Sequence, residues 1–262
     1  MQERQIELTF DSRDAGMVAR LTIANEYRLN SMNSALMGEF LEAVAEAAAN
    51  PGLRALVVTG AGHKAFIGGA DIKEMGAISS PDEARAFITR VHKCCAALRD
   101  LPVPVIARIN GFCFGAGLEL AAACDMRVAV RGALLGMPEV RLGIPSVIDA
   151  ALLPALIGWG RTRRLLLLAE NLTADEALDW GLVEKVAGPA DLDASVDAWL
   201  DLILASPPGA IALQKALIRK WEDLPLSQAI EAGIDSFAAA YETDEPAKAM
   251  GEFLERQRTR KK

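Results

Sequence analysis

The sequence has few histidines and few cysteines. Only His63 and His92 occur among 262 residues, which argues against a histidine-rich zinc site and against a Ser-His-Asp catalytic triad. The four cysteines, with Cys94 and Cys95 adjacent, do not have the spacing of a metal site or of a disulfide framework. We therefore expect no bound metal, and we expect the cysteines to be small buried hydrophobic residues.

Aromatic residues are also scarce, at 5%, whereas 52% of the residues are hydrophobic and 24% are charged. The core must therefore be built from Ala, Leu, Val and Ile, in one large domain or in one domain with a smaller appendage. This composition excludes a disordered chain. The net charge of -7 argues against a nucleic-acid partner, although a local basic patch would still allow an anionic ligand.

Several sequence signals are absent. The longest apolar runs are broken by charge or proline, as by Asp149 and Pro154, so no segment is expected to span a membrane. The first ten residues, MQERQIELTF, lack the apolar core of a signal peptide, and we expect a cytoplasmic protein. A Gly-Lys-Ser/Thr phosphate loop is absent, and Leu120 stands where a dinucleotide-binding G-x-G-x-x-G motif needs its third glycine.

The hydrophobic pattern of the first half predicts an α/β fold. Near-alternating residues predict an antiparallel strand pair at 5–10 and 17–24. Apolar runs without alternation predict strands buried on both faces at 55–59, 105–109 and 126–130. Helices are predicted from an Asn33 cap to about residue 50, over 81–98 and after Ala116. This recurrence of strand, turn and helix implies parallel pairing with right-handed crossovers.

The second half is mainly helical. Helices are predicted at 150–157, 161–169 and 174–180, followed by a strand at 182–186. We place a boundary near residue 190, between an α/β core at 1–190 and a helical section at 191–262. The helices of that section have apolar faces, so they need the core, another subunit or both as a partner surface.

The segment from Asn110 to Asp125, NGFCFGAGLELAAACD, follows a predicted buried strand. Its first half is rich in glycine, and its second half favours a helix. A helix start leaves backbone N–H groups unpaired at the end of the sheet. Glu119 falls in the first helical turn, in otherwise apolar surroundings, and is therefore a candidate for chemistry.

Two further segments are KAFIGGADIKEM at 64–75 and GMPEVRLGIP at 136–145. Each segment alone is a weak signal. Together, two glycine-rich turns could offer the backbone N–H groups of Ala70 and Ala116 to one carbonyl oxygen, as in an oxyanion hole. Glu119 and Glu139 supply the two carboxylates that acid–base catalysis requires.

These three motifs, in this order and spacing, resemble the crotonase, or enoyl-CoA hydratase/isomerase, superfamily. The resemblance extends from Asn30 to about Val186 and, more loosely, over the C-terminal helices. It implies an α/β fold with a crotonase-like spiral of repeated ββα units and a C-terminal helical section that assembles a homotrimer or a dimer of trimers.

The resemblance also implies roles for individual residues. Ala70 and Ala116 match the two oxyanion-hole donors, and Glu119 and Glu139 match the two glutamates of the hydratases. The CoA-binding segment corresponds to Ala70, Asp71, Ile72 and Lys73, with Ala116 also at the acyl-CoA substrate. No separate cofactor is implied, because coenzyme A is part of the substrate.

The implied reaction is syn addition of water to a 2-enoyl-CoA thioester through an enolate. Glu119 would draw a proton from water as hydroxyl adds at C3, and Glu139 would deliver a proton to C2. Two carboxylates that share one water titrate as a coupled pair. We expect Glu119 to ionise more easily than Glu139, because the helix dipole favours a negative charge in the first turn.

Simpler structural interpretations accompany these assignments. Glu119 is suited to a helix start, Asp71 to the N-cap of a helix that begins at Ile72, and Lys73 to a solvated surface. The segment from Ile144 to Ala150 is shorter and bulkier than is usual in the family, which leaves the acyl preference open. Within it, Asp149 is expected to cap the next helix; if it faces the pocket, it would raise the pKa values of the glutamate pair and contact a polar acyl group.

Two other functions remain open at this point. One is double-bond isomerisation, or dehydration of a functionalised acyl-CoA, on the same scaffold. Isomerases generally need one carboxylate, so the pair of glutamates favours hydration. The other is a non-catalytic trimeric module that binds CoA or RNA, against which the glutamate pair and the acidic balance both argue.

Overall fold

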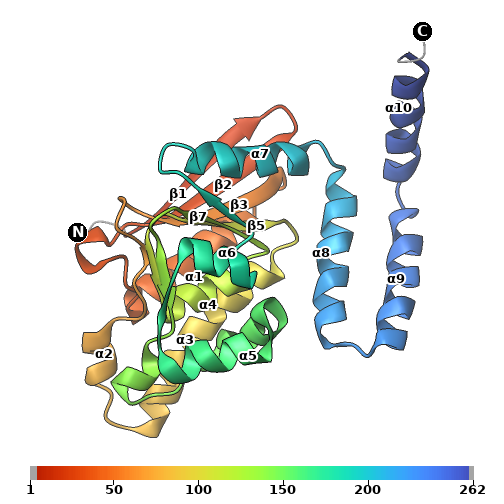
Figure 1. Cartoon of the computed structure of the whole chain (residues 1–262). Helices are drawn as coiled ribbons and strands as arrows, with labels where there is room; N and C mark the ends of the chain where they lie inside the picture. The colour runs from red at the N-terminus through yellow and green to blue at the C-terminus, as the bar shows by residue number, and fades with distance from the viewer. Residues whose placement is uncertain (1–4, 260–262) are drawn as a thin grey trace.

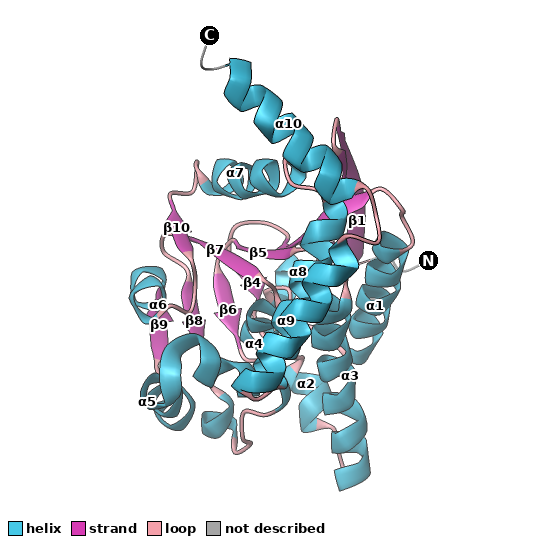
Figure 2. Ribbon diagram, turned by 90° about the vertical axis from the view of Figure 1, so that its right-hand side faces the viewer, coloured by secondary structure: helices cyan, strands magenta, loops and turns pink. Residues whose placement is uncertain are grey.

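Two β-sheets and their covering helices make up the fold, which we describe for residues 5–259 of a computed structural model (Figure 1). Residues 1–4, which belong to the segment without signal-peptide character, and residues 260–262 lie outside the described residues. The last three helices, over residues 208–259, lie along one side of the molecule, at the right in Figure 1 and toward the viewer in Figure 2. The two sheets position the residues of the candidate site.

The larger sheet has six strands in the order β1-β2-β3-β5-β7-β10. These strands are β1 (Ile6–Arg13), β2 (Gly16–Ile23), β3 (Leu53–Gly60), β5 (Val105–Ile109), β7 (Met126–Val130) and β10 (Lys185–Ala187). β1 and β2 are antiparallel, and every other neighbouring pair is parallel, as the sequence predicts. β3 is buried along nearly its whole length, because it has a layer of side chains on both faces.

The smaller sheet has four strands in the order β4-β6-β8-β9. They are β4 (Ala65–Ile67), β6 (Phe112–Phe114), β8 (Leu134–Gly136) and β9 (Asn171–Thr173). The sequence pattern does not predict this sheet, because three-residue strands are too short to show a period. The pairs β3–β4, β5–β6 and β7–β8 each send one strand to each sheet. This repeated unit confirms the predicted crotonase-like architecture.

Helices of different lengths connect the strands. They are η1 (Glu26–Arg28), α1 (Ser34–Ala48), α2 (Ile72–Gly76), α3 (Pro81–Asp100), α4 (Ala116–Ala123), η2 (Glu139–Leu142), η3 (Ile148–Leu152), α5 (Leu153–Leu168) and α6 (Ala174–Trp180). Asn33 caps α1, as predicted, by accepting a hydrogen bond from the amide of Leu36 at 2.8 Å.

Two predicted boundaries need correction. The helices predicted at 150–157 and 161–169 form η3 followed by α5, with a kink where Gly158 has φ 76°. The strand predicted at 182–186 begins only at Lys185. The amides of Leu182 and Val183 instead bond back to the carbonyl of Ala177 and close the end of α6.

The core is aliphatic, as the shortage of aromatic residues predicts. The main cluster fills the space between the sheets and α1, α3 and α4, and includes Phe40, Phe66 and Leu98. All four cysteines are buried and free, as expected. A second cluster forms where Val196 and Leu200 pack on the other face of the larger sheet.

The C-terminal helices are α7 (Leu192–Leu204), α8 (Pro208–Asp223), α9 (Leu226–Ala240) and α10 (Glu245–Thr259). α7 covers the larger sheet, and α8 is attached to the core by the buried Lys215, which donates to Asp125 at 2.7 Å. α9 and α10 stand outside the core (Figures 1 and 2) and expose Ile230, Ile234, Phe237, Met250 and Phe253. The boundary near residue 190 and the assembly through these helices stay predictions.

No single helix within residues 5–259 is long and apolar enough to cross a membrane. α7 and α8 have the required length and composition only when they are taken together, and they meet at a bend of 107°. α7 is also packed against the larger sheet.

Asn110 links the two sheets. Its side chain is buried, and its Nδ2 donates to the carbonyl oxygens of Gly60 and Gly62 at 2.9 Å and of Ala65 at 3.2 Å. Its Oδ1 accepts from the amide of Gly60 at 3.2 Å. Because a buried backbone group without a partner is unfavourable, this one amide holds the ends of β3, β4 and β5 together.

Replacing Asn110 by Ala is expected to destabilise the fold. It removes the Asn110 hydrogen bonds to the buried amide and carbonyl of Gly60, whereas the carbonyl of Ala65 keeps its bond from Asn30. A buried backbone group without a partner costs about 1–3 kcal/mol, so we expect a loss of about 3 kcal/mol in the free energy of unfolding. Urea denaturation measures this loss. The matched control is Asn171→Ala at the exposed end of β9, which should change stability by less than about 0.5 kcal/mol. Equal losses in the two variants would contradict the linking role of Asn110.

Candidate active site

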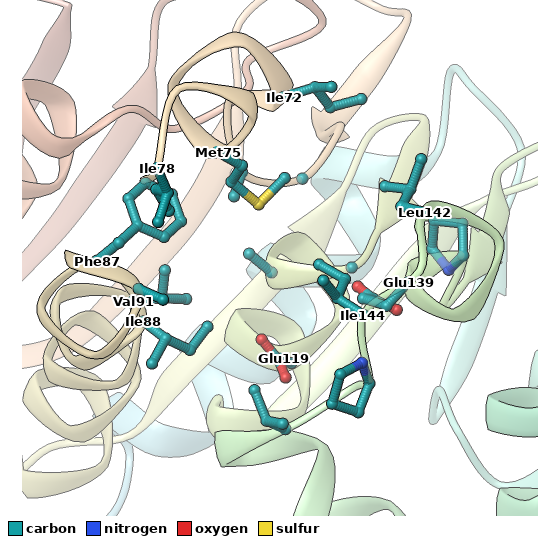
Figure 3. Close-up of a pocket in the computed structure, with 18 of the residues that line it drawn as sticks. Ile72, Met75, Ile78, Phe87, Ile88, Val91, Glu119, Glu139, Leu142 and Ile144 are labelled. Carbon is teal, nitrogen blue, oxygen red and sulfur yellow. The ribbon is translucent and has the colours of Figure 1, made fainter. Parts of the chain in front are cut away.

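A cavity of about 540 Å³ opens beside the carboxyl ends of β4, β6 and β8. Its wall is mostly apolar and includes Ile72, Met75, Ile78, Phe87, Ile88, Val91, Leu142, Ile144 and Val147. Two carboxylates, Glu119 and Glu139, interrupt this apolar wall (Figure 3). The structure thus brings together two glutamates that the sequence placed in separate motifs.

Glu119 lies in the first turn of α4, as predicted, and only 5% of its surface is exposed. Its pKa is raised from 4.5 to about 8, mainly by burial and then by the charges of Glu139 and Asp149, while the amides of Ala150 and Val147 partly oppose the shift. The expectation that the helix dipole keeps Glu119 easily ionised is therefore wrong. Loss of hydration outweighs the favourable effect of the helix start.

Glu139 begins η2 on the opposite side of the cavity floor (Figure 3). Its Oε2 accepts a hydrogen bond from the hydroxyl of Ser146 at 2.8 Å. Its Oε1 lies so close to Gly115 that a Cβ atom placed there would be 2.5 Å away. Sequence analysis missed Ser146, because no local pattern relates a loop hydroxyl to a glutamate in the preceding turn.

The amides of Ala70 and Ala116 line the same cavity. Neither N–H group has a hydrogen-bond partner within residues 5–259, because Ala116 is the first residue of α4 and the bridge at Ala70 is made by its neighbours. A Cβ atom at Gly117 would lie 2.2 Å from the carbonyl oxygen of Ile67. Glycine at this position therefore allows the start of α4 to press against β4 and brings the two turns together.

The other predicted CoA-binding residues lie at α2. Ile72 is exposed and lines the cavity, whereas Lys73 is exposed outside the lining. Asp71 caps α2, as predicted, by accepting from the amide of Glu74 at 3.0 Å, and it pairs with Arg28 at 2.7 Å. The Glu74 amide, and then Arg28, lower the pKa of Asp71. The roles of these residues toward CoA stay predictions.

Asp149 does not cap the following helix. It lies within η3, whose N-cap is Val147, and only 6% of its surface is exposed. Its carboxylate is 2.8 Å from Nδ1 of His92, on α3. Sequence analysis missed this partner, because 57 residues separate the two and no pattern links a helix surface to a later turn.

The chain was compared with known protein families. The sequence profile described as Enoyl-CoA hydratase/isomerase matches residues 13–261. A short-chain-enoyl-CoA hydratase of Clostridium acetobutylicum is 35% identical over 93% of this chain and 93% of its own length. A crotonyl-CoA hydratase of Syntrophomonas wolfei is 35% identical over 92% of this chain and 93% of its own length. The chain belongs to the enoyl-CoA hydratase/isomerase family.

Solved structures have the same fold. An enoyl-CoA hydratase from Bacillus anthracis superposes with a TM-score of 0.90 at 29% identity, over 96% of each chain. An enoyl-CoA hydratase from Mycobacterium smegmatis also has a TM-score of 0.90, at 30% identity over 95% of this chain and 96% of its own. The crotonase resemblance read from the three motifs is therefore confirmed.

The close approach of Gly115 to Glu139 generates a prediction. Gly115 has φ 52° and ψ -122°, a conformation that disfavours side chains, and a Cβ atom there would also press on Glu139. We therefore expect Gly115→Ala to lower the free energy of unfolding by about 2–3 kcal/mol. The control is Gly132→Ala, where φ is also positive, at 97°, but no atom lies within 4 Å of the added Cβ. Denaturant unfolding of both variants should show the larger loss at 115. Equal losses would mean that contact with Glu139 contributes nothing.

Proposed function

We propose that this protein is an enoyl-CoA hydratase that adds water syn across the double bond of a 2-enoyl-CoA thioester. The observation that carries this proposal is the presence of two carboxylates, Glu119 and Glu139, in one apolar cavity with the unpaired amides of Ala70 and Ala116. The names of its hydratase relatives at 35% identity support the same activity.

The two amides are suited to activating the thioester. A carbonyl oxygen placed between the N–H groups of Ala70 and Ala116 would accept two hydrogen bonds, which strengthen as negative charge develops in the enolate. A donor of this kind typically contributes a factor of about 10²–10³ in rate. The cavity is largely apolar, so little water competes for these donors.

The two glutamates would handle the protons. Water held between them gives its proton to Glu119 as its hydroxyl adds to C3, while Glu139 gives a proton to C2. Each hydration therefore leaves a proton on Glu119 and an ionised Glu139. The pair still carries one proton, which must pass from Glu119 to Glu139 before the next turnover. The high pKa of Glu119, about 8, makes this buried group able to hold the proton at neutral pH.

The apolar wall favours a hydrocarbon acyl chain. Ile144 and Val147 come from the bulky segment at 144–150, and both line the cavity. The CoA part would run past Ala70 and Ile72 toward Lys73, as the family motif implies. No cofactor besides the CoA of the substrate is needed for this reaction.

We further propose that the chain assembles as a homotrimer or a dimer of trimers. The exposed apolar side chains of α9 and α10, such as Phe237 and Phe253, support a partner surface there. A monomeric mass in sedimentation equilibrium would contradict this assembly.

Glutamine substitutions test the catalytic pair. Glu119→Gln and Glu139→Gln keep the shape of each side chain but remove its acid–base function, so we expect hydration of crotonyl-CoA to fall by about 10²–10⁴-fold. Binding of a saturated acyl-CoA should persist in both variants. The control is Glu7→Gln on the exposed side of β1, which should have normal activity. Undiminished hydration in both site variants would refute the proposed roles.

The wild-type protein also separates hydration from the competing functions. Incubation with 2-enoyl- and 3-enoyl-CoA esters, followed by chromatography of the products, should give 3-hydroxyacyl-CoA from the 2-enoyl ester. Migration of the double bond without added water would identify an isomerase. Binding of acyl-CoA without turnover of any ester would identify a non-catalytic module.

The raised pKa of Glu119 predicts the pH dependence. Because its pKa lies above the usual 4.5, Glu119 keeps its proton as the pH rises from 5 to 7 and loses it as the pH passes about 8. The pair then has no proton to deliver, so kcat/KM for crotonyl-CoA should fall above about pH 8. A profile from pH 5 to 10, with circular dichroism to verify folding at each pH, measures this. A flat profile between pH 7 and 10 would contradict the assignment.

A further inference from the structure

A buried acidic group lies behind the glutamate pair. Asp149 is on η3, which packs against α4, the helix of Glu119, and against α3. Asp149 does not belong to the wall of the cavity formed by the described residues. Its position therefore argues against contact with a polar acyl group, which the sequence allowed only if Asp149 faced the pocket.

The partner of Asp149 connects it to the surface. Nδ1 of His92 lies 2.8 Å from Oδ2 of Asp149, and 54% of the His92 side chain is exposed, compared with 7% of the Asp149 side chain. The imidazole of His92 is therefore open to solvent, whereas Asp149 and Glu119 are nearly sealed from it. Asp149 thus contacts an exposed imidazole on α3, and its charge acts on the buried carboxyl group of Glu119.

The other ionisable groups around this cluster are Glu139, across the cavity, and two thiols on α3. Burial, and then the charges of Asp149 and Glu119, raise the pKa of Cys95 well above its usual value. Burial also raises the pKa of Cys94, to about 12. Both thiols are therefore neutral at physiological pH, and the charges that act on Glu119 are those of Glu139 and Asp149.

We propose that the His92–Asp149 pair controls how firmly Glu119 holds its proton. Asp149 is a positioning residue whose negative charge favours the protonated form of Glu119, and His92 adjusts the effect of that charge. A negative charge near a buried carboxyl group disfavours ionisation of that group. A positively charged His92 would offset the charge of Asp149, whereas a neutral His92 would leave it at full strength.

The inference rests on the proposed function, since it concerns the carboxylate that accepts the proton of the added water. Each hydration leaves that proton on Glu119 and none on Glu139, and transfer of a proton back to Glu139 completes the cycle. The pair would set how firmly Glu119 holds the proton, and so the pH range in which the glutamate pair carries one proton. Asp149 and His92 need not touch the substrate for this role.

A direct titration tests the proposal without substrate. The side-chain carboxyl carbons of glutamate are labelled with ¹³C, and the Glu119 signal is identified by its loss in Glu119→Gln. We expect Asp149→Asn to lower the titration midpoint of Glu119 by roughly one pH unit, because it removes a neighbouring negative charge. The control, Asp14→Asn in the exposed β1–β2 turn, should leave the midpoint unchanged. An unchanged midpoint in folded Asp149→Asn would overturn the proposal.

Two variants at His92 keep the test valid even if Asp149→Asn does not fold. His92→Gln retains a polar partner without a charge, and His92→Lys supplies a permanent positive charge on the half-exposed surface. We expect Glu119 to titrate at a lower pH in His92→Lys than in His92→Gln. Equal midpoints in these two variants would overturn the role of His92. The exposed His63→Gln serves as the control and should match the wild type.

Hydration of enoyl-CoA and the titration midpoint of Glu119 are measured independently, so the two proposals can be distinguished. If the midpoints shift but no enoyl-CoA is hydrated, the proposed function is wrong and the electrostatic control stands. If crotonyl-CoA is hydrated but the midpoints do not move, the control by His92 and Asp149 is wrong and the hydratase stands. If both hold, the alkaline limb of kcat/KM should move with the titration midpoint in each variant.

Discussion

Burial of the Glu119 carboxyl group is the constraint on which the site depends. An ionised carboxylate in an apolar cavity loses its hydration, so the neutral form is favoured unless cations or amides compensate. Here the nearby charges are those of Glu139 and Asp149, which act in the same direction as burial. The result is an acid that retains its proton at neutral pH beside a second acid that accepts a hydrogen bond from Ser146.

The two sheets create this environment through their repeated connection. Because β4, β6 and β8 are parallel neighbours, the chain leaves each of them at the same edge. The segments that follow carry Ala70, then Ala116 with Glu119, and then Glu139. Residues from three distant motifs therefore meet at one cavity, and the contact of Gly117 with β4 sets the spacing of the first two.

The features predicted correctly from the sequence are those that depend on residues a few positions apart. Apolar runs predicted the strands of the larger sheet, and the caps at Asn33 and Asp71 were recognised, since each depends on residues a few positions apart. Sequence analysis missed the smaller sheet, whose three-residue strands have no readable period. It also misplaced Asp149 as a cap, because a polar residue before a predicted helix has the same local appearance whether or not it is buried.

The sequence by itself determined most strands of the larger sheet, the two glycine-rich turns and the identity of the paired glutamates. These follow from residue type, periodicity and motif spacing, which are properties of neighbours along the chain. Only the tertiary structure decided how readily Glu119 ionises and which groups adjust it. The charge state of a group depends on loss of solvent and on charges nearby in space, and His92 and Asp149 reach this site from elements far apart in sequence.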